Sequence, residues 1–461
     1  MAMSPHSRRD SPRKKQATRK AAAGARPESA KAAEKQGREE KSGYGSNNGA
    51  SEPATAPRVA GAVRVSRRAA DRLRGGHVWV YRTDVEEWPD SELAAGLVPV
   101  TDRRGALLGT GLYSPASEIA LRLISEERVA DEAAWLELLR ERLRAAVARR
   151  DGMLDANNDA VRLVFSEADA LPGITVDRYA GLAIVQLRHK ALDTDAVRAA
   201  VTETLREEKA LETILEREDP RIRELEQLSV PASATLYARD AEHPVTSTVF
   251  RLNGLRFHFD ATSGQKTGAF LDQRENYAAA ARWAQGEALD VCTYQGGFAL
   301  HLARACGRVT GVDVSRAALE VAERNLEQNR GALGAAEVDW IEADAFTLLR
   351  DWSDAGAQYG TIVLDPPAFA KTKRAVEGAL RGYRELNLRA LKMLRPGGRL
   401  VTCSCSHHVS LGDFMETLRG AARDARRRVR VLEVRGAAAD HPVVLNIPET
   451  EYLKCVICEA E

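Results

Sequence analysis

The stretch Leu289-Asp290-Val291-Cys292-Thr293-Tyr294-Gln295-Gly296-Gly297-Phe298 decides how the second half of this sequence is interpreted. Residues 288–291 form a short apolar run that predicts a strand, the two glycines permit a tight turn, and residues 298–305 have a helical composition. A second apolar run follows and ends at Asp313. This order is typical of α/β folds that bind nucleotides, because the bare main chain at a helix N-terminus and a carboxylate about 20 residues later can both contact the ligand.

The spacing of the glycines indicates which adenosine derivative the turn accepts. A dinucleotide fold uses G-x-G-x-x-G to seat a pyrophosphate, whereas this turn has two adjacent glycines and no phosphate-binding pattern. The sequence therefore favours S-adenosylmethionine over NAD or ATP, although the glycines alone also fit an ordinary strand-to-helix turn. We expect main chain 292–297 to hold the methionine end, Asp313 the ribose hydroxyls and Asp344 the adenine amino group. The full predicted cofactor site consists of Gln273, Arg274, Cys292, Thr293, Tyr294, Gly296, Gly297, Asp313 and Asp344.

The first 60 residues differ in composition from the rest of the chain. They are rich in Ala, Ser, Gly, Lys and Arg and have scarcely a large apolar residue, which predicts a disordered basic tail at 1–60. Such a tail either contacts nucleic acid phosphates or is only a solvated segment. The whole chain has 67 Lys and Arg against 66 Asp and Glu, so its net charge says little about partners. Since neither a membrane span of roughly 20 apolar residues nor a signal peptide is evident, we expect a cytoplasmic protein without a membrane partner.

Three segments follow the tail. Short apolar runs separated by Gly and Asp predict a small β-rich module at 61–125. An amphipathic helix and strand-like runs, among them 182–187, predict an α+β connector at 126–250, whose charge runs we interpret as solvated faces. At 251–461, strands such as 359–364 alternate with helices, which predicts an α/β domain with a mainly parallel sheet covered on both sides. Ligands of such sheets bind at the carboxyl ends of strands, and five residues follow predicted strands: Gly296, Asp313, Asp344, Asp365 and Cys405.

Further motifs resemble one known family. They are Gln265-Lys266-Thr267-Gly268, Leu271-Asp272-Gln273-Arg274, residues 364–369, Arg381-Gly382-Tyr383, Ser404-Cys405-Ser406 and residues 438–443; in addition, Gly75-Gly76-His77-Val78-Trp79-Val80-Tyr81-Arg82 resembles the start of a PUA domain. From about residue 60, the sequence is similar to the bacterial 23S rRNA cytosine-5 methyltransferases of the RlmI type. The resemblance implies a class I (Rossmann-like) catalytic domain with S-adenosylmethionine as cofactor and a PUA-like RNA-binding domain. Its implied partner is 23S rRNA, free or in an assembling large subunit, and a homodimer is one compatible arrangement.

The resemblance also implies a reaction. Carbon 5 of cytosine is a poor nucleophile, so a cysteine thiolate must first add at C6. Cys405 takes the place of that nucleophile, and Cys403 is the second choice. Asp365 is expected to hydrogen-bond the N3/N4 edge of the base. The predicted substrate contacts are Pro366 and Pro367, which fix the loop, Phe369, which packs near the base, and Lys371, which with Lys266 and Arg274 is a candidate for phosphate contact.

Two other functions stay open. An Asp-Pro-Pro motif followed by an aromatic residue also occurs in enzymes that methylate exocyclic amines without a cysteine, so an RNA base N-methyltransferase is one alternative. An RNA-binding ribosome-assembly factor without catalysis is the other. A dehydrogenase is a distant third, because the pyrophosphate glycines are lacking.

Two smaller features are interpreted as structural. Cys455-Val456-Ile457-Cys458 has the spacing of metal and redox pairs, but a single pair in an apolar run favours structural thiols and no metal site. Trp79 and Tyr81 alternate with valines, and we interpret them as a buried pair on one strand face rather than as a base-stacking platform.

Overall fold

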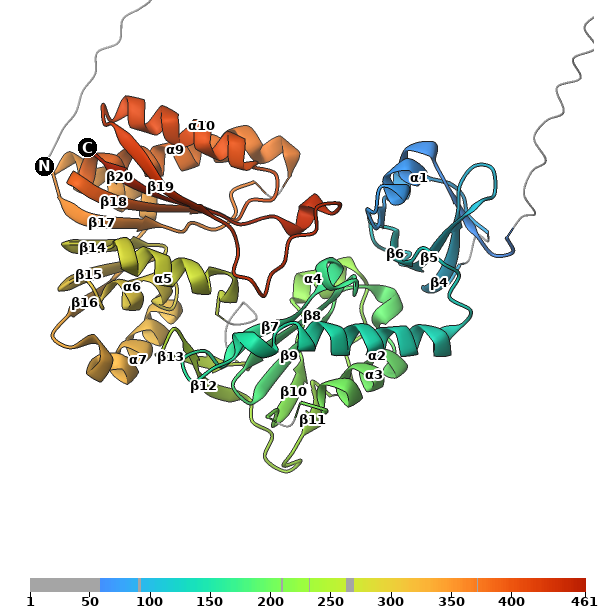
Figure 1. Cartoon of the computed structure of the whole chain (residues 1–461). Helices are drawn as coiled ribbons and strands as arrows, with labels where there is room; N and C mark the ends of the chain where they lie inside the picture. The colour runs from blue at the N-terminus through green and yellow to red at the C-terminus, as the bar shows by residue number, and fades with distance from the viewer. Residues whose placement is uncertain (1–58, 90–92, 209, 232, 263–268, 371) are drawn as a thin grey trace, which may run out of the picture. The chain divides into compact units, whose positions relative to one another are not determined.

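The computed structural model describes residues 59–89, 93–208, 210–231, 233–262, 269–370 and 372–461. Almost all of the predicted basic tail, together with Lys266 and Lys371, lies outside the described residues. Within the described part of the chain, the strands form four sheets of six, five, two and seven strands (Figure 1). No helix in these ranges combines the length and the apolar character needed to cross a membrane.

The six-stranded sheet lies within the predicted β-rich module. Its order is β2-β6-β5-β4-β1-β3, and its elements are β1 (Val63–Val65), α1 (Arg67–Arg74), β2 (Trp79–Val80), β3 (Val85–Glu87), β4 (Gly96–Thr101), β5 (Leu107–Tyr113) and β6 (Leu121–Ser125).

The interpretation of Trp79 and Tyr81 as a buried pair is wrong. Because β2 ends at Val80, the Tyr81 side chain leaves the sheet and is 36% exposed, and Trp79 is only half-buried.

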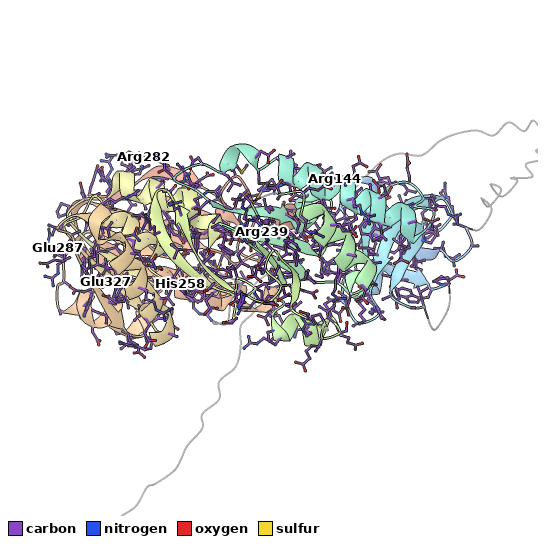
Figure 2. All side chains as sticks on the ribbon, turned by 90° about the horizontal axis from the view of Figure 1, so that it is seen from below. Arg144, Arg239, His258, Arg282, Glu287 and Glu327 are labelled. Carbon is purple, nitrogen blue, oxygen red and sulfur yellow. The ribbon has the colours of Figure 1, made fainter. Side chains whose placement is uncertain are left out.

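The five-stranded sheet belongs to the segment predicted as a connector. Its order is β11-β10-β9-β8-β7, and its elements are α2 (Glu132–Ala148), β7 (Ala160–Phe165), β8 (Ile174–Tyr179), β9 (Leu182–Leu187), α3 (Asp195–Leu205), β10 (Thr213–Glu216), α4 (Pro220–Leu225) and β11 (Thr235–Ala238). Exposed ion pairs such as Arg144 with Glu207 fit the interpretation of solvated charges (Figure 2). That interpretation is wrong for Arg150 and Asp169, which pair at 2.7 Å with side chains 1% and 0% exposed.

A two-stranded hairpin precedes the largest sheet. Strands β12 (Ser247–Leu252) and β13 (Leu255–Asp260) pair antiparallel, from Ser247 opposite Asp260 to Leu252 opposite Leu255. Asn253 and Gly254 alone make the turn, and both have left-handed φ values, 52° and 81°. This is the backbone that a two-residue hairpin turn requires.

The seven-stranded sheet confirms the predicted α/β fold. Its order is β16-β15-β14-β17-β18-β20-β19, with β14 (Glu287–Val291), β15 (Arg308–Asp313), β16 (Glu337–Glu342), β17 (Tyr359–Leu364), β18 (Leu394–Ser404), β19 (Val429–Arg435) and β20 (Lys454–Ala460). Strands β14 to β18 are parallel, and β20 runs antiparallel to β18 and β19.

Helices cover both faces of this sheet (Figure 1). One core contains side chains of α5 (Arg274–Trp283), α6 (Gly297–Leu302) and α7 (Arg316–Leu333). The other contains side chains of α8 (Ala345–Asp354), α9 (Val376–Met393) and α10 (Leu411–Asp424). The order of strands reverses at β14, since β15 and β16 lie on one side of it and β17 and β18 on the other. Ligands of open α/β sheets bind at such a switch point, outside the carboxyl ends of the strands.

Candidate active site

The turn after β14 has a strained backbone. Cys292, Tyr294 and Gly296 have left-handed φ values of 66°, 52° and 83°, and two of these three residues are not glycine. A non-glycine residue in this region costs about 1–3 kcal/mol unless its surroundings hold it there. Hydrogen bonds hold this turn: the Thr293 N–H donates to the Val312 carbonyl, and the Gly296 N–H donates to the Thr293 carbonyl, both at 2.9 Å. The backbone is therefore fixed in one unusual shape at the switch point.

Aromatic rings behind the turn explain its two glycines. A Cβ atom on Gly297 would lie 2.5 Å from the ring of Tyr277, and one on Gly296 would lie 2.9 Å from the ring of Trp340. Because these rings fill the space behind the turn, only bare main chain fits there. The structure thus provides the main-chain cradle expected for an adenosine-derived cofactor.

Asp290, which sequence reasoning did not single out as a site residue, lies in β14 just before this turn and is fully buried. One carboxylate oxygen accepts hydrogen bonds from the Thr293 hydroxyl at 2.6 Å and from the Ala299 N–H at 2.9 Å. The other has no hydrogen-bond partner among the described residues. Burial raises the pKa of Asp290 to about 7, and the nearby Asp313 carboxylate adds to the shift. The sequence feature that could have identified Asp290 was an acidic residue inside the apolar run 288–291.

Asp313 and Asp344 lie just where β15 and β16 end, as predicted. The Asp313 carboxylate accepts the N–H of Tyr294 and the N–H of Ser315, both at 2.9 Å, so it contacts the glycine turn. Asp344 is exposed and caps α8, since it accepts the Thr347 N–H at 2.9 Å, and this bond lowers its pKa. Their predicted contacts with ribose and adenine remain predictions.

Gln273 and Arg274 follow each other at the start of α5, and both are buried. The Arg274 guanidinium forms an ion pair with Asp440 at 3.3 Å. The Asp440 carboxylate also accepts the N–H of Arg162 at 2.9 Å and lies 3.0 Å from Nδ1 of His441. The charge of Arg274 is thus neutralised inside the protein, and its predicted contacts with cofactor and phosphate remain predictions. Gln273 remains a predicted contact.

The predicted nucleophile and the predicted substrate loop lie together. Asp365 follows β17, and the carbonyl oxygen of Pro366 lies 3.9 Å from Sγ of Cys405, which donates to it. Cys405 follows β18 and is half-buried. Since β17 and β18 are adjacent parallel strands, the sheet itself sets this contact.

Phe369 ends the same loop. Its ring centroid lies 4.8 Å from that of Tyr383 and 5.9 Å from that of Phe346, so helices α9 and α8 hold the ring from behind. Pro367 is exposed, whereas Pro366 is buried. The predicted contacts of Pro366, Pro367 and Phe369 with a base remain predictions.

The second-choice cysteine has a different environment. Cys403 is fully buried in β18, directly opposite Cys455 of β20. Burial raises the pKa of the Cys403 thiol well above its ordinary value, and the neighbouring Cys455 adds to the shift. A buried thiol that resists ionisation is a poor nucleophile, so the structure favours Cys405.

The C-x-x-C pair lies within β20. Cys455 belongs to the core beneath α5–α7 and Cys458 to the core beneath α8–α10, so their side chains point to opposite faces of the sheet. Two such thiols cannot bind the same ion. In the ranges that the structure describes, no group of three or more His, Cys, Asp or Glu side chains could hold a metal.

Two residues near Cys405 escaped sequence reasoning. Tyr452 donates its hydroxyl to Asp272 at 2.6 Å, and its ring centroid lies 5.3 Å from that of His407. Lys454 is 5% exposed and donates from Nζ to the carbonyl of Ser406 at 2.8 Å. The sequence feature that could have identified Lys454 was a single lysine next to the apolar run Cys455-Val456-Ile457-Cys458.

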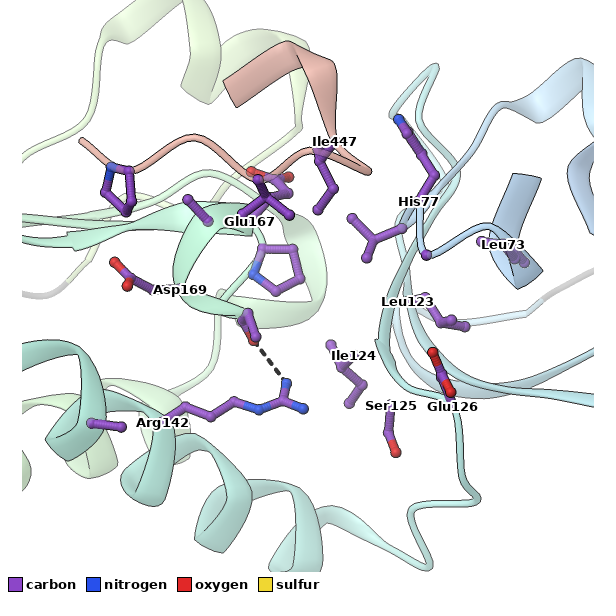
Figure 3. Close-up of a pocket in the computed structure, with 18 of the residues that line it drawn as sticks. Leu73, His77, Leu123, Ile124, Ser125, Glu126, Arg142, Glu167, Asp169 and Ile447 are labelled. Carbon is purple, nitrogen blue, oxygen red and sulfur yellow. Dashed lines mark hydrogen bonds between the residues drawn. The ribbon is translucent and has the colours of Figure 1, made fainter. Parts of the chain in front are cut away.

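A separate cavity of about 640 Å³ is lined by His77, Ile124, Arg142, Pro172 and Ile447, among others (Figure 3). Arg142 donates to the carbonyl of Ala170 at 2.7 Å. None of the predicted site residues that the structure describes lines this cavity, so it is distinct from the strand-end site.

The switch-point fold, the strained glycine turn and the carboxylate of Asp313 define the class of protein, an α/β enzyme built to bind an adenosine derivative. Two family models match the chain: a PUA-like domain over residues 63–126 and an S-adenosylmethionine-dependent methyltransferase over residues 172–444. The chain belongs to this methyltransferase family, whose methyl donor is S-adenosylmethionine.

Two relatives are similar to this chain over most of its length. The ribosomal RNA large subunit methyltransferase I of Shewanella denitrificans is 36% identical to this chain, over 84% of this chain and 96% of the relative. The protein of the same name from Pseudoalteromonas translucida is 34% identical over the same shares. Among solved structures, that of SMU.776 complexed with SAH covers 86% of this chain and 99% of its own, with a TM-score of 0.72 and 19% identity, which supports the fold.

Proposed function

We propose that this protein methylates C5 of a cytosine in 23S rRNA, with Cys405 as the nucleophile. The relatives are named for the large ribosomal subunit RNA, and the PUA-like domain is the module expected to bind RNA. The observation that carries the proposal is the contact of the Cys405 thiol with the Pro366 carbonyl at the carboxyl ends of β18 and β17. The substrate would be free rRNA or an assembling subunit in the cytoplasm, and the enzyme would work as a monomer or a homodimer.

The cofactor would be held by main chain 292–297, by Asp313 and by Asp344. The cradle of bare backbone described above fits the methionine end, and the carboxylate of Asp313, which contacts that backbone, fits the ribose hydroxyls. When bound, S-adenosylmethionine supplies an electrophilic methyl group.

The chain's own residues would make C5 reactive. The Cys405 thiolate adds to C6 of an unstacked cytosine, which places electron density on C5. Asp365 hydrogen-bonds the N3/N4 edge, where charge builds up, and Phe369 packs near the ring. C5 would then take the methyl group as the bond from that group to the sulfonium sulfur breaks. The C5 proton would pass to water and the sulfur of Cys405 would leave C6, which restores the aromatic base.

The Asp365-to-Phe369 loop also favours a second reaction, methylation of an exocyclic amine. In that case Asp365 and the Pro366 carbonyl would hold the amino group and Cys405 would be dispensable. The two reactions therefore differ in their need for one sulfur atom.

The test compares Cys405→Ala with Cys403→Ala, its neighbour within the sheet. rRNA from a strain that lacks the protein and carries each variant is treated with bisulfite and sequenced. We expect one cytosine to lose its protection in the deletion strain, to regain it with the wild type and Cys403→Ala, and to stay unprotected with Cys405→Ala. Protection restored by Cys405→Ala would overturn the thiolate mechanism, and a pattern unchanged by the deletion would point to the amine.

A further inference from the structure

A buried lysine lies against the segment that carries Cys405. Lys454 begins β20 and is 5% exposed, although lysine is almost never buried without a partner. Its Nζ donates to two main-chain carbonyls, that of Ser406 at 2.8 Å and that of Tyr452 at 2.7 Å. Among the described residues, no carboxylate forms an ion pair with this ammonium. The charge is thus hydrogen-bonded but not neutralised by a permanent anion.

The sheet register sets the place of this ammonium. Lys454 pairs with Ser404 in the antiparallel ladder of β18 and β20, and its Nζ reaches Ser406. Cys405 lies between these two residues in the chain. Strand pairing thus holds the ammonium next to the segment that presents the thiol.

Two groups on the Asp365–Phe369 loop act against a thiolate at Cys405. The Pro366 carbonyl accepts from the S–H and therefore favours the neutral thiol. The carboxylate of Asp365 on the same loop repels a second negative charge. Arg162 and Arg274 already have carboxylate partners, because Arg162 pairs with Asp177 and Arg274 with Asp440.

The charged and titratable groups that act on Lys454 are few. Burial lowers its pKa to about 8, whereas the Cys405 thiol and the Glu451 carboxylate act in the opposite direction. His407, on the segment after Cys405, has its own pKa lowered by burial and by the charge of Lys454. A lysine with this pKa is mostly protonated at neutral pH.

Resting on the proposed function, we propose that Lys454 is the positioning residue of the nucleophile: its ammonium fixes the segment 404–406 and stabilises the Cys405 thiolate. The thiol gives its proton to water, and the lysine keeps its three hydrogens. The thiolate then serves as the anion that the Lys454 ammonium otherwise lacks. If Lys454 served only to bind two carbonyls, a neutral donor could do so without the cost of burying a charge.

The test measures the thiol directly and needs no substrate. The alkylation rate of Cys405 by iodoacetamide is followed against pH by peptide mass spectrometry in the full-length wild type, in Lys454→Met and in Lys454→Arg, with Cys405→Ala to verify the peptide assignment. In the wild type we expect a pKa for the thiol below its ordinary value of about 8.5. Lys454→Met should raise it by about one unit, which means roughly tenfold slower alkylation at neutral pH, and Lys454→Arg should restore most of the reactivity.

Each possible result supports or contradicts the inference that Lys454 stabilises the Cys405 thiolate. If Lys454→Met is folded and its Cys405 titrates like the wild type, the inference is wrong. Should that variant fail to fold, a wild-type thiol pKa at or above the ordinary value is equally decisive. Because alkylation is independent of methyl transfer, these results leave the proposed function to the bisulfite experiment. A lowered pKa with full activity of Cys405→Ala would support the thiolate pair and overturn the proposed reaction.

Discussion

The N–H of Tyr294 lies 2.9 Å from the carboxylate of Asp313, so the acid at the end of β15 is bonded to the strained turn at the end of β14. One side chain thereby fixes the cradle and offers its charge to a ligand. Asp313→Ala should weaken S-adenosylmethionine binding about 10- to 100-fold, because a charge-assisted hydrogen bond contributes about 1.5–3 kcal/mol. Isothermal titration calorimetry measures the change. Asp339→Ala, which removes an exposed partner of Arg308, is the control, and equal affinities of the two variants would contradict the assignment.

Gly297→Ala should disturb the turn through its packing. The new Cβ would lie 2.5 Å from the Tyr277 ring, and overpacking of this kind costs about 1–3 kcal/mol. We expect a lower melting temperature and weaker cofactor binding. The matched control is Gly331→Ala in α7, whose Cβ would meet no atom within 4 Å and should leave both quantities unchanged or raise stability slightly. A neutral Gly297→Ala would show that the ring moves aside freely.

Asp290 should make the stability of the protein depend on pH. Its pKa is raised to about 7 in the folded state, so the folded protein binds more protons than the unfolded chain between about pH 4 and pH 7. The contribution of Asp290 to the free energy of unfolding is complete below that window and is lost as pH rises through it. Thermal melts at pH 5 and pH 8 should therefore differ more for the wild type than for Asp290→Asn. Identical differences would show that another group titrates.

Lys454 should set the alkaline side of the activity profile. Lysine is charged below its pKa, which burial lowers to about 8, so the ammonium that stabilises the thiolate disappears above this pH. We expect kcat/KM to fall above about pH 8 in the wild type. In Lys454→Arg the fall should move beyond the range of the assay, since arginine stays charged. The same alkaline fall in Lys454→Arg would assign it to another group.

Asp440 should matter for stability although it is far along the chain from Arg162 and Arg274. Its buried carboxylate holds Arg274, the Arg162 N–H and His441. Asp440→Ala leaves the Arg274 guanidinium buried without its anion, which costs about 3–5 kcal/mol. Chemical denaturation should show this loss, whereas Asp424→Ala, at an exposed pair with Arg384, should change the free energy of unfolding by less than about 1 kcal/mol.

Continuous apolar runs explain why much of the fold could be predicted. Strands β9 and β17 have the predicted bounds, 182–187 and 359–364, because each is a mostly apolar run in a strand that is buried along nearly its whole length. The strand ends then locate Asp313, Asp365 and Cys405 without further information. The hairpin β12–β13 was missed because charged residues alternate with its phenylalanines, yet Asn253-Gly254 between alternating residues is a strong hairpin signal.

Side-chain partners explain what could not be predicted. Nothing near Arg274 in the sequence indicates that its anion is Asp440, and nothing near Arg150 indicates Asp169. The place of Lys454 beside the Cys405 segment depends on the register of β18 with β20, which a linear pattern does not contain. Local patterns therefore predict the elements, and long-range pairing decides which charges are buried.

The order of strands has a consequence for biosynthesis. Strand β19 lies at the edge of the sheet and has β20 as its neighbour, although β20 is made later. Until β20 has been synthesised, β19 therefore has no strand to pair with. The Ser406 carbonyl likewise lacks its hydrogen bond from the ammonium of Lys454. The segment that carries Cys405 therefore gains its contact with Lys454 only after residues 454–460 have been synthesised and have paired with β18.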